Sequence, residues 1–174
     1  HFGVCGGCKW QHMGYEHQIA YKEQEVLNNL KRIGHIELPE VTPIAAAPEA
    51  YFYRNKMEFS FSDSRWLTPE EIQEKDTIED RNALGFHIPG MWDKILDIKK
   101  CHLQADPSNE MRLFVKRFAI AEGITFFNPR NHTGELRTLM IRTSSNGEYM
   151  VLIQFCENNE SNRIKLLEAI KNQF

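Results

Sequence analysis

The chain has few of the features that mark membrane or secreted proteins. No run approaches the roughly 18 consecutive apolar residues that a membrane helix needs, and no charged-then-apolar start resembles a signal peptide. Four cysteines in 174 residues are too few for a secreted disulfide scaffold. With 41% hydrophobic and 26% charged residues, the composition is that of a globular protein, and we expect a cytoplasmic location with no membrane partner.

Positive charge of the kind that attracts nucleic acids is also scarce. The chain carries 21 Lys and Arg against 24 Asp and Glu, a formal net charge of -3. A protein that binds RNA through its overall field leaves a basic footprint. Any RNA contact in this chain must therefore be local.

Hydrophobic periodicity predicts an α+β fold, mainly an antiparallel β-sheet with flanking helices. The alternation over 51–62 places Tyr51, Tyr53, Met57, Phe59 and Phe61 on one face, which we expect to face the core. An Asn-Gly turn between two β-rich segments predicts a hairpin. The expected helices span 15–33, 106–123 and 161–173, and the expected strands span 51–62, 83–88, 94–98, 136–143 and 148–155.

Proline spacing suggests one internal boundary. Pro39, Pro43 and Pro48 make an extended connector. We expect residues 1–48 to hold an N-terminal loop, a helix and this connector, and residues 49–174 to form a central α+β domain. The charged stretch from Asp63 to Asp80 is interpreted as a surface excursion.

Cys5-Gly6-Gly7-Cys8 places two thiols close enough to hold one metal centre. Cys101 is the natural third ligand because it follows a predicted strand end, but zinc sites and iron-sulfur clusters generally take about four. A zinc-stabilised nucleic-acid-binding module would complete the set with a histidine, such as His12. A dithiol oxidoreductase would need a helix starting at the first cysteine, which the two glycines disfavour.

The first twelve residues, from His1 to His12 (HFGVCGGCKWQH), resemble the cluster motif of the uridine-C5 RNA methyltransferases of the 23S ribosomal-RNA type, which binds a [4Fe-4S] cluster. Weaker similarity continues through Tyr53-Arg54-Asn55-Lys56, 85–87, 97–101 and 134–137. By this resemblance Cys5, Cys8 and Cys101 are cluster ligands. Cys156, in an apolar strand, is expected to be a buried small residue.

The resemblance also implies what the chain lacks. The family motif begins with another cysteine, two residues before the position of His1. We therefore expect a fragment that lacks its fourth ligand and can lack the cluster as well. No catalytic residue and no glycine-rich cofactor-binding turn is assignable. We therefore expect the C-terminal methyltransferase domain and its S-adenosylmethionine site to be absent, and this fragment to be inactive.

RNA contacts are expected on the polar face of the strand over 51–62. Arg54 and Lys56 lie there, and in the resembling family this region faces the RNA; the alternative is an ordinary solvated strand face. His87, Trp92 and His102 have the side chains that stack on unpaired bases, although packing roles are more common. The implied partner is ribosomal RNA, with tRNA as the other possibility, and the intact protein is expected to be a monomer.

Overall fold

The computed structural model describes residues 1–73 and 80–174 and contains two compact units. The sheet unit consists of His1, Gly3–Gly7 and Tyr51–Phe174, and the helix unit consists of Phe2 and Cys8–Ala50. The excursion predicted from Asp63 to Asp80 includes 74–79, which lies outside the described residues. No helix in the described part of the chain combines the length and apolar character needed to span a membrane.

The helix unit is held together by polar contacts. Helix α1 (Tyr15–Asn28) continues into one π-helical turn, η1 (Asn29–Ile33), so the predicted helix has the expected extent but a wider last turn. None of its residues is buried. The proline-containing segment returns along it, where the Ala47 amide donates to the Tyr15 hydroxyl (2.8 Å) and the Ile44 amide donates to Glu23 Oε1 (2.8 Å). The unit thus lacks a buried apolar core of its own.

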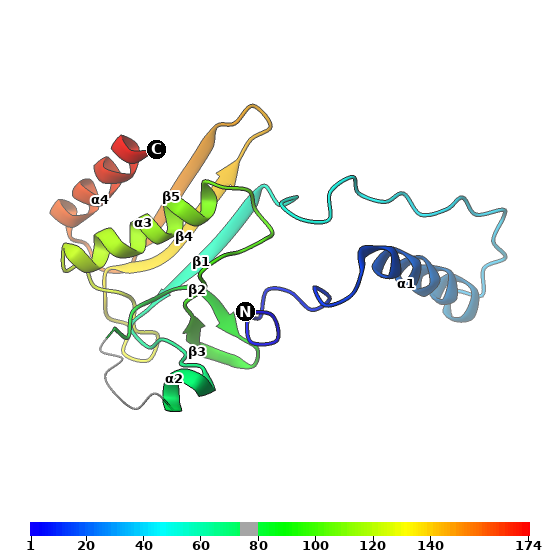
Figure 1. Cartoon of the computed structure of the whole chain (residues 1–174), viewed down its shortest axis with the longest axis horizontal. Helices are drawn as coiled ribbons and strands as arrows, with labels where there is room; N and C mark the ends of the chain where they lie inside the picture. Colours follow the sequence, from blue (N-terminus) through cyan, green and yellow to red (C-terminus); the bar gives the residue numbers. More distant parts are fainter. Residues whose placement is uncertain (74–79) are drawn as a thin grey trace. The chain divides into compact units, whose positions relative to one another are not determined.

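The sheet unit is built on five antiparallel strands, which confirms the predicted α+β class. The strands are β1 (Lys56–Ser62), β2 (Ala83–Ile88), β3 (Met91–Leu96), β4 (Leu136–Thr143) and β5 (Tyr149–Phe155), in the spatial order β3-β2-β1-β4-β5. Helices α3 (Ser108–Ala121) and α4 (Glu160–Gln173) lie over one face of the sheet (Figure 1). The short helix α2 (Pro69–Gln73) comes between β1 and β2 in the sequence.

The core lies between the sheet and α3. Met57, Phe59 and Phe61 of the central strand are at most 2% exposed, as their alternation predicted. Leu139 and Ile141 of β4 pair with Phe59 and Met57 and are fully buried on the same face. This apolar face is the one that the helices cover.

The β4–β5 hairpin forms where the sequence predicted it. Gly147 adopts a positive φ of 85°, which glycine tolerates without a steric penalty. The Ser144 amide donates to the Glu148 carbonyl (2.9 Å), and the ladder begins at the pair Thr143 and Tyr149. The Asn-Gly signal therefore identified the correct turn.

The predicted strand over 51–62 begins later than expected, at Lys56. Tyr51 and Tyr53, predicted to face the core, are 50% and 59% exposed. The Phe52 and Arg54 amides donate to the carbonyls of the two residues after Cys101 (2.9 and 2.8 Å), so this part of the chain leaves the sheet ladder. A contact with a distant loop thus overrides the local alternation.

Helix α4 also departs from the buried stripe of Ile164, Leu167 and Ile170 that helical spacing predicts. Ile170 is buried as expected, but Ile164 and Leu167 are exposed, and Leu166 is buried instead. The helix packs against α3 along a narrow line. Contact with α3 therefore decides which residues of α4 are buried, and these residues cover less than the full apolar face of α4.

Helix α3 buries a charged residue that the sequence pattern did not reveal. The Arg112 side chain is fully buried and lies 5.6 Å from the centre of the Phe59 ring. Its guanidinium donates to the Leu84 carbonyl (3.2 Å) and the Lys99 carbonyl (3.0 Å). Burial lowers the pKa of Arg112 to about 10. This residue joins the helix to β2 and to the segment that leads into Cys101.

We expect Arg112→Met to lower the free energy of unfolding by about 2–4 kcal/mol, because the buried Leu84 carbonyl and the partly buried Lys99 carbonyl lose their donor. Urea unfolding followed by circular dichroism measures the change. Arg117→Met is the matched control, since Arg117 is exposed on the same helix. Equal unfolding midpoints for the two variants would contradict the role assigned to Arg112.

Candidate metal centre and nucleic-acid interface

The loop that carries Cys5 lies directly against β2 within the sheet unit. The Gly6 amide donates to the His87 carbonyl (3.2 Å), and a Cβ atom at Gly6 would lie 2.6 Å from that oxygen. His1 Nε2 accepts a hydrogen bond from the Lys99 amide (3.0 Å). Glycine is thus required for the close approach that places Cys5 beside the segment leading to Cys101.

Cys101 is positioned by the first turn of α3. Its amide donates to Asn109 Oδ1 (2.8 Å), and Asn109 Nδ2 donates to its carbonyl (3.0 Å). Burial raises the pKa of the Cys5 thiol, the Gly7 amide lowers it by donating to the sulfur, and the nearby Cys101 raises it further. The fold therefore brings Cys5 and Cys101 together from distant parts of the sequence.

The remaining cysteines differ from this pair. Cys8 belongs to the helix unit. Among the residues that the structure describes, no group of three His, Cys, Asp or Glu side chains is placed to hold a metal ion. Cys156, predicted to be buried, is exposed because it follows β5, the edge strand of the sheet, although its amide still donates to the Glu135 carbonyl (2.8 Å).

The donor set nevertheless fits a cluster in its chemistry. Thiolates are the ligands that [4Fe-4S] clusters take. Cys5 lies in the loop whose Gly6 amide bonds to β2, and Cys101 lies near it in a segment held by Asn109. The histidine alternative gains no support from His12, whose ring lies 5.1 Å from that of Phe2 within the helix unit. Iron bound to Cys5 and Cys101 would favour their deprotonated forms against the mutual repulsion.

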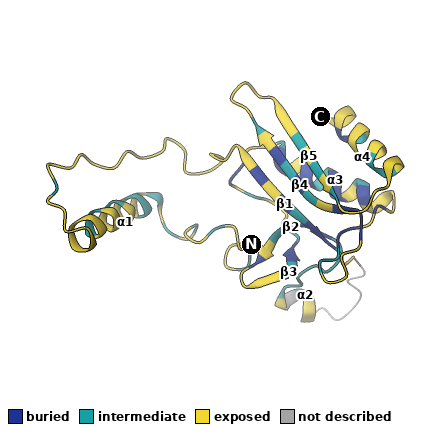
Figure 2. Cartoon of the chain, turned by 180° about the vertical axis from the view of Figure 1, so that it is seen from behind, coloured by how far each residue is buried: buried dark blue, intermediate teal, exposed yellow. Residues whose placement is uncertain are grey.

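The second candidate feature is the face of the sheet opposite the helices, which we call the open face. Figure 2 shows it without a helix over β1, β4 and β5. Lys56 and Glu58 are exposed there and lie 3.7 Å apart at their charged groups. Lys56 pairs in register with Arg142 of β4, which is also exposed. Sequence reasoning missed Arg142, although the alternation of β4 carried the signal.

Other residues weighed for RNA contact have different surroundings. Arg54 is exposed just before β1, and its amide is held by the Leu103 carbonyl. The His102 ring lies among the rings of Tyr51 and Phe52, with centroids 6.2 and 6.1 Å away. The structure thus gives His102 aromatic neighbours and leaves Arg54 open to solvent.

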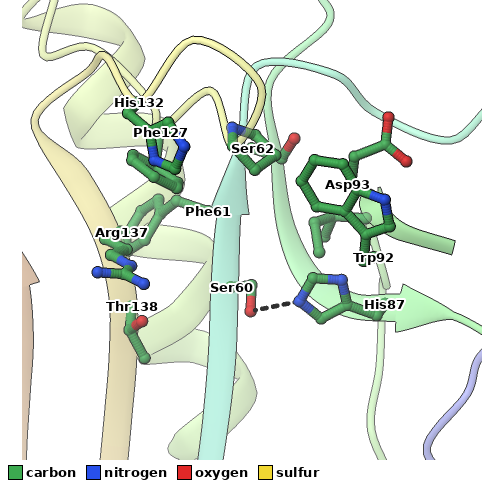
Figure 3. A pocket seen from close by; sticks show the side chains of 12 residues that line it. Ser60, Phe61, Ser62, His87, Trp92, Asp93, Phe127, His132, Arg137 and Thr138 are labelled. Carbon is green, nitrogen blue, oxygen red and sulfur yellow. Dashed lines mark hydrogen bonds between the residues drawn. The ribbon is translucent and has the colours of Figure 1, made fainter. Parts of the chain in front are cut away.

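A pocket of about 360 Å³ opens at one end of the sheet unit (Figure 3). It brings together His87 and Trp92, which the sequence suggested, with polar residues of β1 and β4 that it did not. Ser60 Oγ and His87 Nε2 lie 3.2 Å apart. The lining consists of Ser60, Phe61, Ser62, His87, Trp92, Asp93, Ile95, Phe127, Pro129, His132, Arg137 and Thr138.

Comparison with known proteins points to one enzyme class. No protein-family model matches the chain. An uncharacterized RNA methyltransferase of Porphyromonas gingivalis is 50% identical over the whole chain, and one of Bacteroides thetaiotaomicron is 49% identical over 98% of it. The chain is homologous to part of these RNA methyltransferases. It spans only 38% and 37% of their lengths.

A solved structure agrees with the sequence comparison. The tRNA (uracil-54, C5)-methyltransferase of Pyrococcus abyssi, in complex with S-adenosyl-L-homocysteine, superposes with a TM-score of 0.63 and 28% identity. The match covers 93% of this chain and 34% of that protein. Both units of the present chain therefore fall largely within the matched region.

We expect Gly6→Ala to make Cys5 react about 10-fold faster with a thiol reagent, because the new methyl group clashes with the His87 carbonyl and lifts the loop from β2. The rate is measured with Cys8, Cys101 and Cys156 replaced by serine. Gly7→Ala is the control, since a Cβ there meets only ordinary contacts at 3.5 Å or more. Equal rates for both variants would show that the close approach does not hold the loop.

Proposed function

We propose that the chain is one part of an S-adenosylmethionine-dependent RNA uridine-C5 methyltransferase that acts on large-subunit ribosomal RNA. This part supplies [4Fe-4S] ligands and RNA contacts. The observation that carries the proposal is the packing of the Cys5 loop against β2 and against Lys99, two residues before Cys101, in a chain whose relatives are named RNA methyltransferases. The solved neighbour is a tRNA uracil-C5 enzyme, which supports uracil C5 as the methylated position and keeps tRNA as the alternative substrate.

The ligands are Cys5, Cys8 and Cys101, with a fourth from outside this set. A cluster with every iron held by cysteine offers no open coordination position. Its role here is to fix the Cys5 loop against the Cys101 segment and so to orient the surface around them. Closing so long a loop is entropically costly without such a link.

The chemistry of methyl transfer belongs to other parts of the whole protein. Attack on uracil C6 needs a cysteine nucleophile, and removal of the C5 proton needs a base. S-adenosyl-L-homocysteine, bound to the solved neighbour, is what S-adenosylmethionine becomes after giving up its methyl group. We expect this chain alone to bind no methyl donor and to be inactive.

RNA contacts are assigned to the open face. The open face carries the exposed pair Lys56 and Arg142, which are register partners on adjacent strands. Arg54 is exposed just before β1. Clustered cations on an otherwise acidic chain are suited to phosphate oxygens, which fix the position of a nucleic acid without reading its sequence. Such a local basic group would supply the positive charge that the chain as a whole lacks, with Lys56 also paired to Glu58 (3.7 Å).

We expect anaerobic treatment with iron, sulfide and dithiothreitol, which offers an external thiolate, to load the chain with iron and acid-labile sulfide in equal amounts. Cys5→Ser and Cys101→Ser should reduce the iron content to about a third or less, since serine is a poor cluster ligand. Cys156→Ser should match the unmodified chain. Uptake of zinc without iron or sulfide would contradict the cluster and favour a zinc-stabilised module.

We expect the double variant Lys56→Gln, Arg142→Gln to weaken binding of a single-stranded RNA and to reduce the slope of log Kd against log salt by about 1.4, because each phosphate contact contributes about 0.7. Fluorescence anisotropy at several salt concentrations measures both quantities. The control, Arg117→Gln with Lys171→Gln, removes the same charge from exposed helix positions. Equal slopes for the two double variants would contradict the open face as the RNA-contacting surface.

A further inference from the structure

The lining of the pocket at the end of the sheet includes no cysteine and neither Lys56 nor Arg142. Figure 3 shows Trp92 and Asp93 on one side of it and Arg137, Phe127 and His132 on the other. All its lining residues belong to the sheet unit. Its volume of about 360 Å³ lies within the range of roughly 300–1,000 Å³ seen for small-ligand sites.

Two irregularities of the sheet aim side chains at this pocket. The β4–β5 register shifts between Leu136 and Thr138, which places Arg137 in a bulge. The β2–β3 register shifts between His87 and Ile88. Bulges redirect side chains and are common next to binding sites. Arg137 and His87, the residues at these bulges, both line the pocket.

Aromatic and cationic groups face each other across the opening. Trp92 is 65% exposed, an unusual placement for so large an apolar ring in the absence of a partner. Opposite it, the Arg137 guanidinium lies 5.2 Å from the centre of the Phe127 ring. In the described part of the chain Arg137 has no hydrogen-bond or ion-pair partner besides its contact with the Phe127 ring, so its donors are free for an anion.

The polar groups of the pocket do not oppose an anion. The Asp93 carboxylate is paired with Arg130, at 2.7 Å from Nε and 2.6 Å from the terminal nitrogen. The hydrogen bond from Arg130 lowers the pKa of Asp93, so the Asp93 carboxyl stays ionised and its negative charge is compensated by the Arg130 guanidinium. Ser60 and Thr138 place hydroxyl groups between the two walls, and a hydroxyl both donates and accepts.

We propose that this pocket binds one unpaired nucleotide of an RNA strand, with the base against Trp92 and His87 and the phosphate on Arg137. The inference rests on the proposed function, because it takes RNA as the partner, and it adds a base-binding subsite to the phosphate contacts of the open face. The nucleotide must be unpaired because a base in a duplex has neither a free ring face for Trp92 nor a free Watson–Crick edge for the hydroxyls.

The test is fluorescence anisotropy of the 174-residue chain with two labelled single-stranded RNA probes of about ten nucleotides, one intact and one abasic throughout. Trp92→Ala and Arg137→Gln should each weaken binding of the intact strand about 10-fold. Trp92→Phe keeps an aromatic face and should remain within about 3-fold of the unmodified chain. Trp92→Ala should leave binding of the abasic strand unchanged, whereas Arg137→Gln should weaken it.

The outcomes separate this site from the proposed function. In one outcome the unmodified chain binds RNA and the double variant Lys56→Gln, Arg142→Gln binds it more weakly, while Trp92→Ala and Arg137→Gln bind it as well as the unmodified chain. That result would contradict the nucleotide site in the pocket and support RNA contact at the open face. If the unmodified chain binds neither probe, both proposals fall. Displacement of the strand by free uridine monophosphate at equal concentration would also overturn the site, since it would then be a mononucleotide pocket.

Discussion

The buried guanidinium of Arg112 connects the parts of the sheet unit on which its candidate sites depend. It lies over the Phe59 ring of the central strand and donates to carbonyls of β2 and of the segment before Cys101. The Leu84 and Lys99 carbonyls satisfy its two terminal nitrogens, whereas its buried Nε has no hydrogen-bond partner among the described residues. A buried cation depends strongly on the partners that it does have. The backbone around Leu84 and Lys99 is therefore fixed in the geometry that Arg112 requires, and Cys101 follows directly from it.

The two faces of the sheet have opposite physical roles. The face under α3 and α4 buries the alternating apolar residues of β1 and β4, and this burial provides most of the stabilisation. The opposite face carries Lys56, Arg142 and the pocket that Trp92 borders. A strand with one buried face leaves every second residue available for function. The same alternation that builds the core therefore supplies the proposed RNA surface.

Non-local contacts explain where sequence-based prediction went wrong. Tyr51 and Tyr53 continue the alternation of β1, yet amides in this segment bond to carbonyls beyond Cys101, and both rings are exposed. In α3 helical spacing predicts a buried stripe of Met111, Phe114, Val115, Phe118 and Ala121. This stripe omits Arg112 and Lys116, which are buried. Lys116 is paired at 2.8 Å with Asp97, which follows β3 and lies 19 residues away in the sequence. Periodicity ranks residues by polarity and so fails where a distant partner satisfies a buried charge.

The sequence by itself determined the α+β class, the hairpin at Asn146-Gly147 and the alternation of Met57, Phe59 and Phe61, because each depends on contacts or turn chemistry within a few residues. It also singled out Cys5 and Cys101 as candidate ligands. Only the tertiary structure decided that these two thiols lie together, and that Trp92 and Arg137 share one pocket. Both arrangements arise from strand pairing and register shifts between distant segments, which no local pattern encodes.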